Sequence, residues 1–335
     1  MRTINHWINN AEVGSTSGNF GPVYNPATGE QQAQVGLASV SEVDAAVAAA
    51  KEAFTTWRSA SLSRRAEVMF AFHQLVLANR DKIAELVSIE HGKVPSDAGG
   101  ELARGIENIE FACGIPQLMK GNFSEQASTG VDVFSIRQPL GVVAGITPFN
   151  FPAMVPMWMF ANAIATGNTF ILKPSEKDPS VTLFVADLLR QAGLPEGVFN
   201  IVQGDKVAVD RILEHPDIAA VSFVGSTPIA EYIYSTGTAN GKRVQALGGA
   251  KNHMIVLPDA DIDMAADAAV SAGYGSAGER CMAISIVVAV GDAGDKLVDA
   301  ISARLPKLKV GPGTDPDAEM GPLITREHRD KVASY

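Results

Sequence analysis

The stretch GVVAGITPFNFPAMVPMWMFANAIATGNTFILKPS, residues 141–175, decides the fold. It holds two short apolar runs, VVAGIT and TFILKPS, on either side of a helical segment. Three similar runs follow, VFNIVQG at 198–204, AAVSFVGS at 219–226 and RVQALGG at 243–249. The helical segments between the runs lie near residues 153–165, 179–191, 206–214 and 228–235. Strands that alternate with helices in this way predict an α/β fold, a doubly wound parallel sheet with helices on both faces.

The same stretch raises the question of a membrane span, because residues 138–172 contain no charged side chain. Four prolines and three asparagines interrupt it, among them Pro152 and Asn162. A helix facing lipid would have to satisfy the broken backbone groups and the amides without water. We therefore interpret these residues as a buried strand, a turn and a core helix, and we expect no membrane partner.

Composition agrees with a globular protein of two domains. The chain has 335 residues, of which 46% are hydrophobic and 19% are charged, enough apolar residues for a sizeable core. Its net charge of −10 does not favour a nucleic-acid partner. Two cysteines suggest a reducing compartment, and the first residues, MRTINHWINNAEVG, lack the apolar segment of a signal peptide. We expect a cytoplasmic location.

The region before residue 141 is predicted to be mostly helical. Ser41 and Asp44 resemble a capping box that starts one helix. A second helix is expected from about Ser63 to Glu90, ending at Gly92, and a third from about Asp97 to Leu118. Residues 123–143 alternate like strands and could form a hairpin that leaves the domain and needs a partner to cover its edges.

Ligands of doubly wound sheets bind outside the carboxyl ends of the strands, so functional residues are expected there. Gly225 and Ser226 form a small-residue turn before a helix that starts at Pro228, where backbone N–H groups could bind a phosphate. A tight turn with no ligand explains the same residues. Lys173 and Glu176 could hydrogen-bond ribose hydroxyls, or they could belong to a solvated loop.

Cys281 is the leading candidate for a nucleophile. It lies in GERCMA, and the neighbouring Arg280 and the glycines before it favour a thiolate and access to it. The alternative for Cys281 is an inert residue that only packs in the core. The other cysteine, Cys113, has no such neighbours, and we assign it to packing. The six histidines lie far apart and neither HExxH nor CxxC occurs, so we expect no metal. GxSxG is absent as well.

Taken together, several motifs resemble the aldehyde dehydrogenase superfamily in their order and spacing, from about residue 20 to the end of the chain. They are NPATGE, TPFNFP, ILKPSE, GLPEGVFNIVQG, SFVGST, VLPDAD and GERC. The resemblance implies an NAD-binding domain (residues 1–120 and 142–246), a bridging hairpin used in homo-oligomers (121–141) and a catalytic domain (247–335). It also implies a catalytic domain that continues beyond Tyr335, so that this chain would be truncated.

The resemblance assigns roles to individual residues. Cys281 resembles the nucleophile, and Asn150 resembles the side-chain half of an oxyanion hole whose other half is the Cys281 N–H. The residues that resemble cofactor contacts are Thr147, Phe149, Lys173, Glu176, Lys177, Gly225, Ser226 and Gly248.

One departure from the family pattern is informative. Hydrolytic members carry a Glu that activates water, and depending on the alignment Ala246 or Leu247 occupies its place. Three features resemble the CoA-acylating methylmalonate/malonate-semialdehyde dehydrogenases: this departure, AKNH at 250–253, and GERCMA. By this resemblance, Arg104 and Arg280 would bind the carboxylate of a 3-oxo acid substrate. For Arg104, sequence spacing alone favours ordinary helix pairing with Glu101 or Glu107.

The resemblance therefore implies an NAD-dependent oxidation with CoA as co-substrate, giving acetyl-CoA or propionyl-CoA and CO₂. The alternatives are a hydrolytic aldehyde dehydrogenase with another base, and a protein that binds NAD without catalysis.

Overall fold

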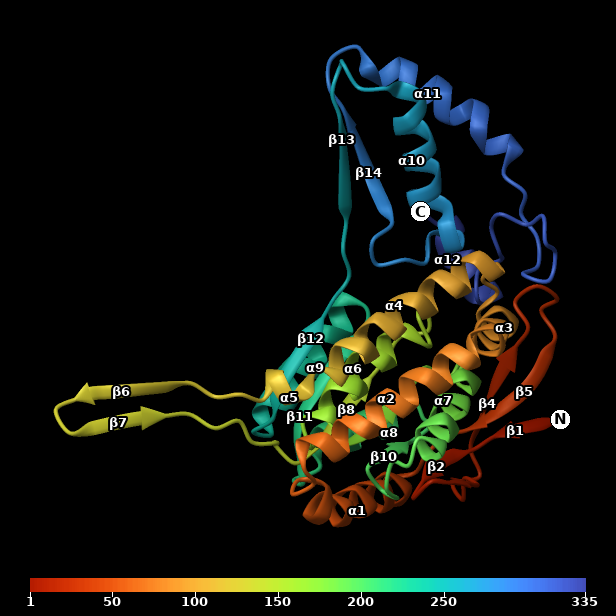
Figure 1. The fold of residues 1–335 in the computed structure, drawn as a ribbon. Helices are drawn as coiled ribbons and strands as arrows, with labels where there is room; N and C mark the ends of the chain where they lie inside the picture. Colours follow the sequence, from red (N-terminus) through yellow and green to blue (C-terminus); the bar gives the residue numbers. More distant parts are fainter.

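A seven-stranded sheet forms the centre of the computed structural model, which describes residues 1–335 (Figure 1). Its strand order is β12-β11-β8-β9-β10-β2-β3. The five strands predicted from the apolar runs are all present and parallel: β8 (Val142–Ile146), β9 (Thr169–Lys173), β10 (Phe199–Ile201), β11 (Ile218–Val224) and β12 (Arg243–Leu247). At one edge β2 (His6–Ile8) adds antiparallel to β10, and β3 (Ala11–Val13) pairs with β2. The predicted doubly wound sheet is confirmed.

Helices pack on both faces of this sheet, as the alternating pattern predicts. One face is covered by α2 (Leu62–Ala78), α3 (Arg80–His91), α4 (Pro95–Cys113), α6 (Met154–Ala165) and α7 (Ser180–Gln191). The other face is covered by α1 (Val40–Trp57), α8 (Lys206–Glu214) and α9 (Thr227–Ala239). The uncharged stretch forms β8, the twelve-residue α6 and β9. No helix in the structure has both the length and the apolar character that crossing a bilayer requires.

Several predicted helix boundaries differ from the observed ones. The helix expected near Ser41 begins at Val40, and its capping box is formed by Ser39 and Glu42 rather than by Ser41 and Asp44. The helix predicted from Ser63 to Glu90 is two helices, α2 and α3, with Asn79 between them. Gly92 ends α3 with φ of 92°, a left-handed conformation that glycine adopts without strain. A short helix, α5 (Ile115–Leu118), follows α4.

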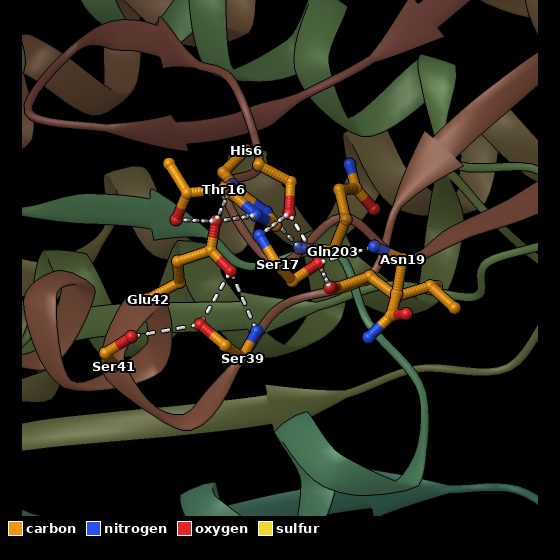
Figure 2. A network of polar contacts seen from close by, with 10 residues as sticks. His6, Thr16, Ser17, Asn19, Ser39, Ser41, Glu42 and Gln203 are labelled. Atoms are coloured by element: carbon orange, nitrogen blue, oxygen red, sulfur yellow. Dashed lines mark hydrogen bonds and ion pairs between the residues drawn. The ribbon is translucent and has the colours of Figure 1, made fainter.

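The N-terminal region contains strands that the sequence did not predict. A second sheet joins β1 (Arg2–Ile4), β5 (Gln31–Gly36) and β4 (Phe20–Tyr24). Figure 2 shows the polar network that ties this region to the central sheet. His6 accepts a hydrogen bond from the Gln203 N–H at 3.1 Å, and Glu42 accepts from Thr16 N at 2.6 Å and from Ser39 N at 2.8 Å. Three of the five strands from β1 to β5 have only three residues, so this region carries little local signal.

Two segments stand away from the central sheet (Figure 1). The strands β6 (Phe123–Ser128) and β7 (Val131–Phe134) form the predicted hairpin, every residue of which is exposed. The C-terminal segment holds a two-stranded parallel sheet, β13 (Asn252–Val256) and β14 (Ile284–Ala289), together with α10 (Ile262–Tyr274), η1 (Gly275–Gly278), α11 (Ala293–Arg304), η2 (Leu305–Lys307) and α12 (Arg326–Ala333). The functional roles given to these segments stay predictions.

Candidate active site

A cleft of about 1390 Å³ lies where the carboxyl ends of the central strands meet the C-terminal segment. Strand ends of β8, β9 and β11 form one side, and residues 273–285 and 320–332 contribute to the other. Ten of the twelve residues that the sequence singled out line it: Thr147, Phe149, Asn150, Lys173, Glu176, Gly225, Ser226, Gly248, Arg280 and Cys281. A second, mostly apolar hollow of about 600 Å³ over β8, β11 and β12 contains none of the twelve.

Cys281 is exposed at this cleft, on the loop that leads into β14. Asn252 of β13 holds the loop by donating to the carbonyl oxygens of Cys281 and Ala283 at 2.9 and 3.0 Å. Before the loop, Ser276 and Ala277 both have φ of 54°, a left-handed conformation that is unfavourable for residues with a side chain. Cys113, in contrast, is buried in the helical core, where burial raises the pKa of its thiol. Only Cys281 is therefore placed to react with a ligand.

Asn150 points its side-chain amide toward the Cys281 loop. Its Nδ2 donates to the Glu279 carbonyl oxygen at 2.9 Å. The Asn150 carbonyl oxygen accepts from Lys93 Nζ at 2.6 Å, and Lys93 also pairs with Glu101 inside the protein. An asparagine amide has two protons, so one remains for a ligand oxygen.

The β9 end of the cleft carries a buried cation beside a partly exposed carboxylate. Lys173 Nζ lies 3.1 Å from Glu176 Oε2, and the Lys173 side chain is 7% exposed. Burial alone would raise the pKa of Glu176, but Lys173, a main-chain hydrogen bond and the charge of Lys177 together outweigh it and the pKa is lowered. Lys177 does not line the cleft, and its Nζ lies 4.7 Å from the centre of the Phe149 ring.

The N-terminus of α9 opens into the cleft. Ser226 precedes the helix, and its hydroxyl makes no capping hydrogen bond. Gly225 N donates to the Leu247 carbonyl oxygen and Gly249 N to Thr227 Oγ1, both at 3.1 Å, which fixes this turn against the end of β12. Gly248 lies so close to Thr227 that a Cβ atom there would be about 3.0 Å from Thr227 Oγ1. The helix end and its free hydroxyl suit an anionic group.

The structure separates the two arginines that the resemblance brought together. Arg280 lines the cleft and pairs with Asp97 of α4. Arg104 does not line it: its Nη1 bonds both carboxylate oxygens of Glu107 at 2.9 Å, and the side chain is exposed. This is the helix pairing that sequence spacing alone favours. Of the two, only Arg280 is beside Cys281.

Ala246 and Leu247, the two residues that the resemblance compares with a catalytic base, carry no carboxylate. Ala246 and Leu247 are the last residues of β12, and Leu247 borders the apolar hollow instead of the cleft.

The structure contains no group of three or more His, Cys, Asp or Glu side chains placed to hold a metal ion.

A buried polar cluster, which the sequence does not predict, lies below the Cys281 loop. Glu279, two residues before Cys281, points its carboxylate toward two histidines, His91 at the end of α3 and His328 of α12. Burial raises the pKa of Glu279 to about 7 and lowers the pKa values of both histidines. Glu279 was part of a quoted motif, but the histidines are far away in sequence, so no local pattern linked the three.

The aldehyde dehydrogenase family profile matches residues 13–335. A malonate-semialdehyde dehydrogenase of Pseudomonas aeruginosa is 53% identical over 100% of this chain and 67% of its own length. Malonate-semialdehyde dehydrogenase 2 of Geobacillus thermodenitrificans is 54% identical over 100% of this chain and 69% of its own. The chain thus spans about two thirds of these relatives.

Solved structures are similar over the whole chain. The methylmalonate-semialdehyde dehydrogenase of Oceanimonas doudoroffii superposes with a TM-score of 0.98 at 57% identity, covering 100% of this chain and 69% of that one. A Sinorhizobium meliloti 1021 protein, assigned as a methylmalonate-semialdehyde dehydrogenase and solved with NAD, gives a TM-score of 0.98 at 55% identity, covering 100% and 68%.

Proposed function

The chain belongs to the aldehyde dehydrogenase family, and from that membership we propose that it oxidises malonate semialdehyde or its methylated analogue. NAD would be the oxidant and CoA the acyl acceptor, and the products would be NADH, CO₂ and acetyl-CoA or propionyl-CoA. The observation that carries this proposal is the exposed Cys281 in one cleft with Asn150, Arg280 and the polar strand ends. The names of the relatives support the substrate class.

The residues along the cleft fit a dinucleotide. The Thr147 hydroxyl is buried without a hydrogen-bond partner, and the Ser226 hydroxyl is uncapped at a helix N-terminus. Ser226 and the α9 N–H groups would hold the pyrophosphate, with Gly225 and Gly248 allowing close approach. Lys173 and Glu176 would bind ribose hydroxyls as donor and acceptor, and the Glu176 carboxylate disfavours a 2′-phosphate. NAD, when bound, accepts a hydride from the substrate carbon.

In the first half of the reaction, Arg280 would bind the substrate carboxylate through its planar, permanently charged guanidinium. The Cys281 thiolate adds to the aldehyde carbon and forms a thiohemiacetal. Asn150 Nδ2 and the Cys281 N–H donate to the oxyanion that develops. Loss of the hydride from the same carbon then leaves a thioester on Cys281.

In the second half, the thioester carries a carboxylate beta to its carbonyl. The C–C bond to that carboxylate breaks and CO₂ leaves, while the electron pair forms an enolate whose oxygen the same two donors stabilise. After the enolate carbon takes a proton, the CoA thiolate attacks the carbonyl and the Cys281 thiolate departs. The absence of a carboxylate at Ala246 and Leu247 supports a thiol acceptor, since loss of a general base slows hydrolysis by about 10²- to 10⁴-fold.

The deciding experiment is product analysis with malonate semialdehyde and NAD, with and without CoA. We expect NADH and acetyl-CoA to form in equal amounts over many turnovers when CoA is present, and no more than about one NADH per chain when CoA is left out. Cys281→Ala should abolish both, whereas Cys113→Ala, the matched buried cysteine, should retain them.

Each alternative has its own signature in this experiment. Free acid formed at full rate without CoA would contradict the acylating reaction and favour a hydrolytic enzyme. NAD binding by calorimetry without any NADH formation would favour a protein that binds the dinucleotide without catalysis. Full turnover by Cys281→Ala would exclude the thioester.

The exposed hairpin supports a homo-oligomer as part of the proposal. Phe123, Phe134 and Ile136 are each more than 60% exposed on β6, β7 and the residues after them. Such a hairpin needs a partner to cover its edges and apolar side chains. Light scattering of the protein and of a variant with Phe134→Ser would test this, with a shift to monomer expected for the variant.

A further inference from the structure

Four segments that are distant in sequence meet below the Cys281 loop. Glu279 is the centre of this cluster, and its side chain is 3% exposed. Its Oε1 lies 3.2 Å from His328 Nε2 and accepts from the Ile324 N–H at 3.4 Å. Its Oε2 lies 3.7 Å from His91 Nε2 and has no hydrogen-bond partner. The carboxyl group therefore joins the end of α3, the segment before α12 and α12 itself.

The ring of Phe149 closes the cluster toward the cleft. It stacks on His91 with ring centres 6.0 Å apart and contacts the edge of His328 at 5.5 Å. Gly321 and Pro322, which precede Ile324, pack directly against Gly92, so the C-terminal segment lies on the end of α3. These contacts leave the Glu279 side chain little freedom to move.

The main chain of the same residue connects this cluster to the reacting groups. The Glu279 carbonyl oxygen accepts the hydrogen bond from Asn150 Nδ2, and Cys281 follows two residues later. Asn150 is also held from below by Lys93. Any displacement of Glu279 must therefore move both the amide expected to stabilise the oxyanion and the cysteine expected to attack.

We propose that Glu279 is a positioning residue: its buried carboxyl group, held by His328 and the Ile324 N–H, fixes the main chain that orients Asn150 and carries Cys281. The proposal rests on the proposed role of Cys281 as the reacting thiol. Glu279 acts through its neighbours and does not touch the substrate.

The carboxyl group is also placed to make this site depend on pH. Burial raises its pKa to about 7, although the Ile324 N–H and the charges of Lys93 and Lys177 act in the opposite direction. The other titratable groups that face it are His91, whose pKa burial lowers well below its usual value, and His328, whose pKa is lowered by burial and then by Lys177 and Lys331. Near pH 7 the histidines are neutral while Glu279 loses its proton, so a negative charge forms two residues from Cys281.

The test is the rate at which iodoacetamide alkylates Cys281 between pH 5.5 and 9, followed by mass spectrometry. Cys113 is buried, and a Cys281→Ser variant gives its background. We expect the wild-type curve to contain an inflection near pH 7 in addition to the rise from the thiol itself. In Glu279→Gln this inflection should disappear, and alkylation above pH 7 should be about two- to fourfold faster, because the negative charge near the thiolate is gone.

Glu279→Ala separates positioning from charge. Below pH 6, Glu279→Gln should react at the wild-type rate because the amide keeps the hydrogen bonds of the protonated acid, whereas Glu279→Ala should differ from both. Glu327→Gln, which removes an exposed carboxylate next to His328, should reproduce the wild-type curve. If Glu279→Gln keeps the inflection near pH 7, the proposal is overturned, and the isosteric variant yields this result even if the alanine variant fails to fold.

This readout needs neither aldehyde nor turnover. A chain that shows the inflection and loses it in Glu279→Gln, but forms no NADH, would contradict the proposed function alone. A chain that forms acetyl-CoA but shows no effect of Glu279→Gln on alkylation would contradict the positioning role alone.

Discussion

Two pairs of parallel strands in this protein have similar sequences and opposite surroundings. The pair β8 and β9, VVAGI and TFILK, is buried at all ten positions. The pair β13 and β14, NHMIV and ISIVVA, has six of its eleven residues exposed. Helices cover both faces of the first pair with core clusters of 33 and 18 buried residues, whereas the cluster beside the second pair has five. An apolar run thus predicts a strand, but the layers that cover it come from other parts of the chain.

The largest expected effect on the free energy of unfolding comes from changing an isoleucine to alanine in the buried sheet, with the same change in the exposed sheet for comparison. Ile171→Ala in β9 should lower the free energy of unfolding by about 2–5 kcal/mol, because the side chain is fully buried and leaves a cavity. Ile286→Ala in β14, where the side chain is 41% exposed, should cost about 1 kcal/mol or less. Urea unfolding followed by circular dichroism measures both. Equal losses would mean that β14 is covered in solution.

The same contrast explains how far the sequence predicts this structure. The strands that carry VVAGIT or TFILKPS, and the helices between them, follow from local patterns. The strands from β1 to β5 were missed, since three of them have only three residues and β2 joins the central sheet by pairing with the distant β10.

The candidate site shows the same limit. Cys281, Asn150 and the Lys173–Glu176 pair lie at strand ends or on loops that the sequence marks, and the cleft brings them together. Arg104 pairs within its own helix, which spacing alone favours. The contact of Glu279 with His91 and His328 joins residues that are 188 and 49 positions apart, and no local rule predicts it.

A second comparison between the regions concerns two glutamates with opposite pKa changes. Burial raises the pKa of Glu279 to about 7. In the N-terminal region burial also acts to raise the pKa of Glu42, but hydrogen bonds from Ser39 and Thr16 and the nearby His6 outweigh it and lower the pKa to about 2. The difference lies in the number of donors that each carboxylate receives.

The raised pKa of Glu279 predicts that the free energy of unfolding falls as pH rises. The native protein prefers the protonated acid, so the contribution is complete below pH 4.5 and is lost as pH rises through 7. Glu279→Gln removes this dependence. Relative to wild type, its free energy of unfolding should increase by about 2–3 kcal/mol between pH 4.5 and 8. Urea titrations of both proteins at several pH values measure the difference, and a constant difference would contradict the raised pKa.

For Glu42 the pH dependence of the free energy of unfolding has the opposite sign, and the expected change is smaller. The carboxylate completes the capping box of α1, so Glu42→Ala should cost about 1–2 kcal/mol at pH 7. Because the pKa of Glu42 is lowered to about 2, its contribution is present above pH 4.5 and is lost as pH falls toward 2. Thermal unfolding at pH 7 and pH 3 should show the loss shrinking in acid. Glu52→Ala, an exposed residue of the same helix, should show neither effect.

The smallest expected effect is at the surface of the C-terminal segment, where charges rather than a core join the helices. Arg304 at the end of α11 pairs with Asp263 of α10 at 3.0 Å and with Asp267 at 2.5 Å, and both carboxylates are largely exposed. Water and salt screen such pairs, so Arg304→Met should shift the urea midpoint less than the three changes above, and the shift should vanish in 1 M NaCl. A shift that persists in high salt would mean that the aliphatic part of Arg304 packs against the five-residue cluster between these helices. That outcome would make the C-terminal segment resemble the central sheet more than its exposed strands indicate, since its helices would then depend on apolar packing as those around β9 do.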